Sequence, residues 1–387
     1  MCAFISVNQF VSVSVSTPPV GLKSFQVNNL AIFTKETPLV VSGRVTPTAL
    51  LPGIYVSPAD VLADWGSASE VYQQALAVFS QSPSILDGNG SLVVFPMSSG
   101  ELLKDVIPLG LVIVYFGGVM WAGYAPEDPE ILAASTEVAA LQGVKLFASS
   151  HLSASNAGFF ETIRAATQTH TRCFLYIVGG TPLAARLAMA AYAGRALSVD
   201  FEGVNTTATM HGKTLIGVTP DTGITSSILA ESKVSGADVY PSVGGGAQYL
   251  GKVFSTGSND YFDNVYNLDW LVSSLQVAGF NTLTQVGTKL PQTETGMAIL
   301  RGAYITVLQQ AVANTFVAPG EWNSSELFGV PADLRRNILN VGWYIYSQPV
   351  NQQSQAARAA RQAPLVQIAI KFAGAIQSSN VVVSVNQ

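Results

Sequence analysis

The residue types that most often carry catalysis or bind metals are few in this chain and are poorly spaced for either role. The three histidines, His151, His170 and His211, form no i,i+4 pair and no H-E-x-x-H motif, so they lack the spacing of a metal site. The sequence contains no G-x-S-x-G motif, the nucleophile elbow of many hydrolases. We therefore predict no metal-binding residue and expect the histidines to be ordinary structural residues.

Two carboxylate pairs are close enough in sequence to suggest acid–base chemistry. They are Asp260 with Asp263 and Asp200 with Glu202, and glycoside hydrolysis, for example, uses two carboxylates that flank one bond. Pairs at such short spacing also arise by chance and commonly cap or solvate loops. We expect no catalytic residue, and we keep a hydrolase that uses the Asp260 and Asp263 region as an alternative.

One glycine-rich stretch, Gly246–Lys252, matches the G-x-x-x-x-G-K pattern of a phosphate-binding loop. Such a loop needs Ser or Thr as its next residue, to hold Mg²⁺, at the start of a helix. Val253 follows instead, and Gly257 interrupts the helix that should begin there. The turn at Gly179–Thr181, which precedes a predicted helix, is a similarly weak indication of an anion site. We expect glycine-rich turns at both places and no bound cofactor.

The composition limits the class of protein. Of the 387 residues, 48% are hydrophobic and 11% are charged, whereas an average soluble domain has about 25% charged residues. The net charge of −5 argues against nucleic-acid binding, which usually needs a basic domain, and the hydrophobic content argues against disorder. The length suggests two to three domains. Because so little charge is available for the surface, we expect other subunits to cover much of it.

The cysteines and the first residues indicate synthesis in a reducing cytoplasm. Cys2 and Cys173 cannot form a disulfide framework, and Cys173 lies in an apolar run that predicts a buried thiol. The N-terminus has neither the basic nor the apolar region of a signal peptide.

A stretch without charged residues, 106–126, is long enough to cross a bilayer. It contains Pro108 and several glycines, and its β-branched run ends at the pair Gly117 and Gly118. We therefore predict a buried strand over Leu111–Phe116 and no membrane insertion.

Strands alternate with helices of about 10 to 15 residues over residues 91–200, a pattern typical of a mostly parallel sheet. The rest of the chain is α+β in character. The predicted fold class is α/β plus α+β: a mostly parallel α/β domain followed by an α+β C-terminal domain, with extended β-strand arms at both ends. The predicted ranges are 1–22 for the N-terminal arm, 23–90 for a small mixed α+β region, 91–285 for the α/β domain, 286–376 for the C-terminal domain and 377–387 for the C-terminal arm.

Both ends of the chain alternate between apolar and other residues with a period of two, which predicts strands with one apolar face. These strands are either edge strands of one intramolecular sheet or strands exchanged with neighbouring subunits, because unpaired backbone groups of a strand can pair with another chain. The residues concerned are Ile5, Val7, Val11, Val13, Val15, Val381, Val383 and Val385.

Basic residues are concentrated near the C-terminus. From Leu334 to Gln387 the chain has five basic residues and no acidic one. Arg358 and Arg361 are three residues apart on a helix predicted over residues 352–362, so they face the same way. This helix is either a solvated face or a basic surface that docks an acidic patch on a partner.

Several short blocks resemble the tail sheath proteins of contractile-tailed bacteriophages (myophages). The resemblance extends over nearly the whole chain and is strongest in its C-terminal half, although residues 96–110 are short for the family. The blocks are Asn28–Phe33, His170–Cys173, Gly194–Val199, Leu215–Asp221, Asn267–Leu271, Ala318–Trp322, Gln353–Arg358 and Ile370–Ile376.

The resemblance implies a structural subunit without enzyme activity. Subunits of this family polymerise around the tail tube as stacked rings or a helical sheath, exchange terminal strands with their neighbours, and contract to drive the tube through the host envelope for genome ejection. Their C-terminal domain is innermost and touches the tube through a basic helix, for which Arg358 and Arg361 are the candidates.

The resemblance also implies partners and a location. The partners are further copies of the chain, the tail tube protein, and the baseplate and tail terminator proteins, with no nucleic acid. The location is the phage virion, assembled in the bacterial cytoplasm. Two alternatives remain: a tail-associated hydrolase that uses the Asp260 and Asp263 region, and another structural tail or baseplate subunit.

Overall fold

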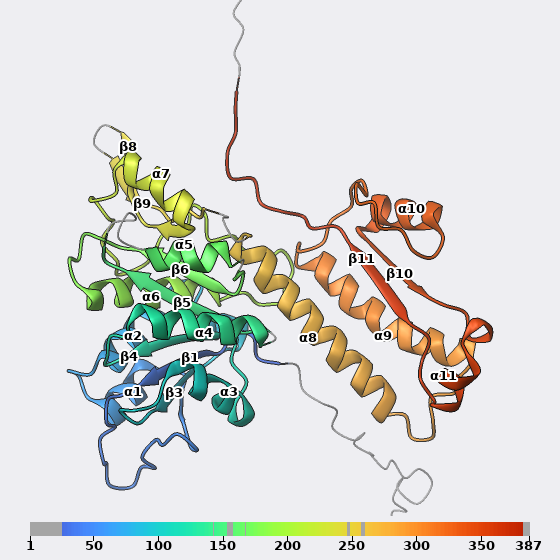
Figure 1. Cartoon of the computed structure of the whole chain (residues 1–387), viewed down its shortest axis with the longest axis horizontal. Helices are drawn as coiled ribbons and strands as arrows, with labels where there is room; N and C mark the ends of the chain where they lie inside the picture. Colours follow the sequence, from blue (N-terminus) through green and yellow to red (C-terminus); the bar gives the residue numbers. More distant parts are fainter. Residues whose placement is uncertain are drawn as a thin grey trace, which may run out of the picture.

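The computed structural model describes residues 25–141, 143–152, 158–166, 168–245, 248–256 and 260–381. Two lobes are connected by one long helix, α8 (Phe262–Thr284), as Figure 1 shows. The N-terminal lobe is built on a parallel sheet and the C-terminal lobe on a helix pair and a small sheet. The predicted combination of a mostly parallel α/β part and an α+β C-terminal part is therefore confirmed, whereas the strands predicted at residues 1–22 and 382–387 lie outside the described residues.

The N-terminal lobe contains a seven-stranded sheet within the described residues, in the order β2-β3-β1-β4-β5-β6-β7. All neighbours are parallel except β2, which runs antiparallel to β3 along one edge. The strands are β1 (Leu30–Thr34), β2 (Gly53–Tyr55), β3 (Leu92–Pro96), β4 (Gly118–Ala122), β5 (Lys145–Ser150), β6 (Thr171–Leu175) and β7 (Ala237–Val239).

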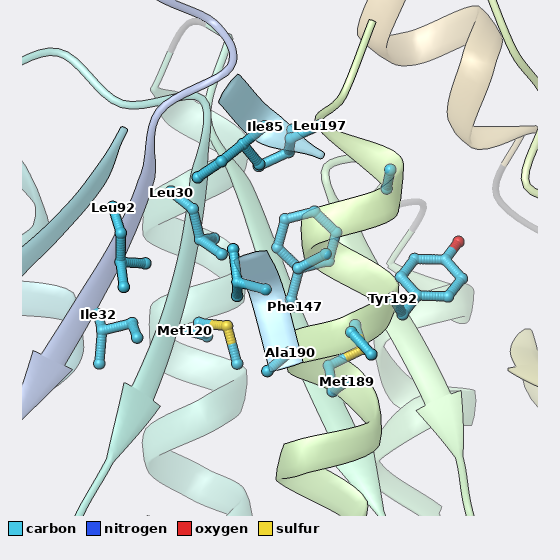
Figure 2. Close-up of a cluster of buried hydrophobic side chains, with 14 of the residues drawn as sticks. Leu30, Ile32, Ile85, Leu92, Met120, Phe147, Met189, Ala190, Tyr192 and Leu197 are labelled. Atoms are coloured by element: carbon cyan, nitrogen blue, oxygen red, sulfur yellow. The ribbon is translucent and has the colours of Figure 1, made fainter. Parts of the chain in front are cut away.

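Helices cover both faces of this sheet, which explains why its central strands are continuous apolar runs. Leu30 and Ile32 of β1 pack on one face and Ala31 and Phe33 on the other, in two separate hydrophobic clusters. Figure 2 shows the first face, where Leu30, Met120 and Phe147 lie against α6. Helices α1 (Pro58–Trp65), α2 (Glu70–Phe79) and α6 (Pro182–Ala196) cover this face, and α3 (Leu103–Ile113), α4 (Asp128–Ala140), α5 (Gly158–Ala165) and α7 (Ser226–Ser235) cover the other.

The C-terminal lobe packs helices on both sides of a two-stranded antiparallel sheet. Its sheet consists of β10 (Trp343–Ser347) and β11 (Val366–Ile370). Its helices are α9 (Glu294–Ala313), which pairs with α8, the shorter α10 (Pro331–Val341) and the very short α11 (Gln355–Ala359). The remaining elements of the described residues are a hairpin and two 3₁₀ turns. The hairpin pairs β8 (Ser242–Gly245) with β9 (Gln248–Gly251), and the turns are Ile85–Gly88 and Val350–Gln352.

Helix α8 contributes to the cores of both lobes. Its first turns place Phe262 and Tyr266 in the core of the N-terminal lobe, and Leu271 belongs to the core of the C-terminal lobe. Gly279 lets α8 approach α9 closely, because a Cβ there would lie 2.6 Å from the Tyr304 hydroxyl oxygen. The helix is therefore a packed connection between the lobes.

The strand predicted over Leu111–Phe116 is wrong. Residues 111–113 end helix α3, and the strand of this region is β4, which begins at Gly118. The glycine pair starts the strand because it permits close packing: a Cβ on Gly117 would lie 1.9 Å from the Val27 carbonyl oxygen. Among the described residues no helix is both long and apolar enough to span a membrane.

The boundary predicted at residue 90 does not separate two packed units. Strands β1 and β2 lie within the range 23–90, yet β1 pairs with β3 and β4 and occupies the middle of the large sheet. Hydrophobic patterning marks individual strands but does not indicate which strands share a sheet. The other boundaries remain predictions.

Candidate functional site

An α/β sheet usually binds ligands outside the carboxyl ends of its strands, at the point where the strand order reverses. Here this point lies between β1 and β4, since the chain continues from β1 to one side and from β4 to the other. Glu36, just after β1, accepts hydrogen bonds from the Glu70 backbone N–H (2.9 Å) and the Ser69 hydroxyl (2.8 Å) at the start of α2. A carboxylate of the chain itself thus occupies the helix N-terminus that could bind an anion.

A second carboxylate, Glu70, fills the same crevice. Arg186 of α6 donates two hydrogen bonds to it, at 2.6 and 2.8 Å, and the Gly123 backbone N–H donates a third at 3.1 Å. The cavity that remains beside Trp121, His151 and Arg186 has a volume of about 160 Å³, below the roughly 300–1,000 Å³ of typical ligand pockets.

A larger groove of about 490 Å³ lies between α2, α6 and residues 216–219. It is lined mainly by apolar side chains, and Tyr176 is its one titratable residue among those described. The groove therefore offers no acid–base pair.

The carboxylate pairs considered in the sequence stabilise local turns. Asp260 Oδ1 accepts hydrogen bonds from the Tyr261 backbone N–H (2.7 Å) and from Asn264 Nδ2 (2.8 Å). Asp200 Oδ1 accepts one from the Glu202 backbone N–H at 3.0 Å. Both arrangements are capping geometries.

Two of the three histidines contact structural partners. His211 Nδ1 lies 3.3 Å from the Ser255 backbone nitrogen, and His170 Nε2 lies 3.2 Å from Asp269 Oδ1. Within the described ranges no group of three or more His, Cys, Asp or Glu residues could hold a metal ion. Cys173 is buried, as predicted, and burial raises the pKa of its thiol.

Neither glycine-rich stretch has the geometry of a phosphate site. Residues 248–251 of the Gly246–Lys252 motif form strand β9, where a phosphate loop would need to begin a helix, and Lys252 Nζ donates to Thr214 Oγ1 at 3.0 Å. The Thr181 hydroxyl accepts a hydrogen bond from the Ala184 backbone N–H at the start of α6.

The surface with the clearest capacity for binding is the pair of open edges of the β10–β11 sheet. One face of the sheet packs on α8 and α9 through Trp343, Ile345 and Ile368, and the other packs on α10 through Tyr344 and Ala369. With both faces covered, only the edges can accept another strand. Among the described residues each of the two strands pairs along one side only.

The hydrogen-bond register shows which backbone groups point outward. Lys371 N donates to Gly342 O (2.8 Å) and Gln348 N donates to Leu365 O (3.4 Å). Bonded and non-bonded pairs alternate along an antiparallel ladder. The outward-facing backbone groups are therefore those of Trp343, Ile345 and Ser347 on β10, and of Val366, Ile368 and Ile370 on β11.

The C-terminal arm leaves the C-terminal lobe from this sheet. After β11 the chain bridges to Val317 through Phe372 and then continues as an extended segment away from the lobe (Figure 1). Ile376 is 95% exposed and Val381 is 80% exposed, so apolar side chains of the arm have no cover in a single chain. The other predicted arm residues, Ile5, Val7, Val11, Val13, Val15, Val383 and Val385, lie outside the described residues.

The two arginines predicted to contact a tube are both exposed at the end of the C-terminal lobe, far from the N-terminal lobe (Figure 1). Arg358 lies on α11, but Arg361 does not: the helix ends at Ala359, and Arg361 has a positive φ of 55°. The helix predicted over 352–362 is thus shortened, because Pro364 and the left-handed residue end it. Neither guanidinium forms an ion pair with a carboxylate of the described residues.

A buried ion network that the sequence did not predict holds α8 on the large sheet. Lys145 Nζ lies 2.5 Å from Asp269 Oδ2, and His170 Nε2 lies 3.2 Å from Asp269 Oδ1. Burial raises the pKa of Asp269, but the charge of Lys145 and the hydrogen bond from His170 outweigh it, so the net shift is downward. The available signal was one lysine inside the apolar run Val144–Ala148.

Comparisons with known proteins agree with this architecture. Residues 262–385 match a family model described as "E217 tail sheath protein gp31-like, C-terminal domain", which begins at the first residue of α8. A solved structure of an extracellular contractile injection system, the PVC sheath complex in its contracted state, is similar in fold. That match has a TM-score of 0.61 at 11% identity and covers 99% of this chain and 98% of the other.

A search of curated proteins gives no match. Together, the family model and the shared fold support the resemblance to the contractile tail sheath family.

Proposed function

We propose that this chain is the structural subunit of a contractile tail sheath. In this proposal it polymerises around a tail tube by exchanging terminal strands and contracts to drive the tube through a host envelope. The observation that carries the proposal is the β10–β11 sheet, which is covered on both faces and open along both edges. A two-stranded sheet is marginal alone, and edge strands readily pair with further chains.

The arms supply matching strands. The period-two sequences at the two ends of the chain provide one apolar face each, and the exposed side chains of Ile376 and Val381 would gain cover in a neighbour. Two arms and two open edges give each subunit as many strand donors as acceptors, so the exchange can continue through a whole sheath.

Further copies of this chain, a tail tube protein, and baseplate and tail terminator proteins are the partners in this proposal, and a phage virion is the location. The proposed driving force for contraction is the contact area and charge pairing gained between subunits. Arg358 and Arg361 are placed against the tube, where polar contacts at an exposed surface are weak enough to be released.

Electron microscopy of the purified chain, alone and with its tube protein, tests the proposal. We expect hollow striated cylinders with a lumen that fits a tail tube. Discrete particles under both conditions would contradict the sheath proposal and favour the alternatives. A hydrolase would then show an activity that Asp263→Ala abolishes, and another tail or baseplate subunit would show a different particle diameter.

A further inference from the structure

A polar cavity lies where the lobes and the C-terminal arm meet. Its volume is about 150 Å³, and it is lined by the loop 207–209, the first turns of α8, residues 315–316 and the arm root at 373–375. A water molecule occupies about 30 Å³ in the liquid, so the cavity has room for a small ion together with some of its hydration water.

Three donors in the cavity wall are already used within the chain. The hydroxyls of Thr207 and Thr315 donate to the Asn314 carbonyl oxygen at 2.8 and 2.6 Å. Asn264 Nδ2 donates to Asp260 Oδ1 at 2.8 Å. The wall also has oxygen lone pairs that no hydrogen bond of the described residues uses.

Two oxygens in the wall accept no hydrogen bond from the described residues. They are Asp263 Oδ1 and Asn267 Oδ1, both buried, and the Asn267 side chain belongs to a residue that is only 4% exposed. Four residues apart on α8, they lie on the same face of the helix. Buried acceptors without partners are costly and call for an explanation, such as an ion.

We propose that this cavity binds a hard divalent cation of the Ca²⁺ type, through the carboxylate of Asp263, the amide oxygen of Asn267 and neighbouring hydroxyl oxygens. Carboxylate, amide and hydroxyl oxygens together with water are the ligands such cations take. One carboxylate gives a low ligand charge, so the expected dissociation constant is on the order of 10⁻⁴–10⁻³ M.

The electrostatic surroundings of Asp263 agree with this assignment. Burial raises the pKa of the Asp263 carboxyl and Asp260 adds to the shift. A hydrogen bond from its own backbone N–H, the charge of Arg172 and a hydrogen bond from Thr209 oppose the shift without cancelling it. A cation in the cavity would compensate the buried negative charge directly.

A bound cation would connect the start of α8 to the root of the C-terminal arm. Gly374, in the cavity wall, has a φ of 65° and marks a sharp change of chain direction there. Ca²⁺ binding itself does not depend on the proposed sheath function. Its effect on the direction of the arm does rest on that function.

Equilibrium dialysis of the full chain against radiolabelled Ca²⁺ tests the site, with thermal unfolding at matched ionic strength as the second measurement. We expect wild type to bind Ca²⁺ and to unfold at a higher temperature in its presence. Asp263→Asn should bind about tenfold more weakly or worse, because it removes the single charged ligand.

Asn267→Leu, which keeps the branching and the number of side-chain heavy atoms, should also weaken binding. Asp333→Asn, a change of a partly exposed carboxylate on α10, should leave it unaltered. Absence of Ca²⁺ binding by wild type would overturn the proposal and assign the cavity to water. Equal binding by wild type and Asp263→Asn would overturn it as well. Because the cavity lies within one chain, Ca²⁺ binding in dialysis does not depend on whether the chain forms a sheath.

Discussion

Asp269 is separated by 99 residues from His170, and the fold brings both beside the fully buried Lys145. Removing one member of a buried ion pair is strongly destabilising, since it leaves an uncompensated charge. Asp269→Asn should therefore lower the free energy of unfolding by about 3 kcal/mol at pH 7. Urea denaturation of the purified protein measures this loss.

The stability difference between wild type and Asp269→Asn should depend on pH. The folded pKa of Asp269 is lowered, so its stabilisation is complete above the unfolded value of about 3.9 and is lost as pH falls through the folded pKa. The stability difference between wild type and Asp269→Asn should thus shrink below about pH 4. The double variant Lys145→Met with Asp269→Leu is the control and should recover most of the stability. A difference that stays constant with pH would argue against the ion pair.

A second prediction about individual residues concerns Arg358 and Arg361. Changing both to Glu should weaken co-sedimentation with the tube protein and leave thermal unfolding unchanged, because both side chains are exposed and form no ion pair with the described residues. Arg335→Glu, also exposed in the same lobe, is the matched control. Unchanged co-sedimentation of the double variant would mean that the basic segment is only a solvated surface.

At the scale of elements, the open edges of the β10–β11 sheet determine how strands can be added. The Ile368 backbone N–H points outward, so proline there removes no bond to β10 but blocks a new strand. Ile368→Pro should remain folded by circular dichroism and fail to form cylinders in electron microscopy.

Ile368→Ala provides the control, because it loses the same packing against α8 and α9 and keeps the outward N–H. We expect it to assemble. The backbone N–H of Gln367 points toward β10, so Gln367→Pro should destabilise the C-terminal lobe itself. Assembly by Ile368→Pro equal to that of Ile368→Ala would exclude this edge as a strand acceptor.

Individual helices and strands show where the local sequence pattern is sufficient to predict secondary structure. An Asp-Pro pair is typical of a helix start, and α4 begins at Asp128. The apolar run Leu111–Phe116 predicts a strand, but a short apolar run fits a buried helix equally well. Packing between Gly110 and three phenylalanine rings, Phe33, Phe95 and Phe116, favours the helix there, and this contact is invisible in the local sequence.

At the scale of the whole molecule, the surface carries many apolar side chains for a single chain. Val40 is 89% exposed and Ile376 is 95% exposed, in a chain with only 11% charged residues. Large exposed apolar areas commonly mark surfaces that other proteins cover. This agrees with a subunit that functions within an assembly.

Deleting residues 1–16 tests assembly at this scale. The strands and helices of the described residues all follow residue 25, so the truncated chain should fold and sediment as a monomer. It should form no cylinders, because a strand that links neighbouring subunits is lost. Normal cylinders from the truncated chain would refute strand exchange through the N-terminal arm.

The sequence by itself determined the fold class, the buried thiol of Cys173 and the lack of catalytic spacing, because composition and local periodicity report directly on burial and element type. It also indicated the sheath resemblance through short blocks. Only the tertiary structure decided that β1 lies in the middle of the sheet, that Asp269 meets Lys145, and that Asp263 and Asn267 line a common cavity. These depend on contacts between distant segments, whose energies arise only once the chain has packed.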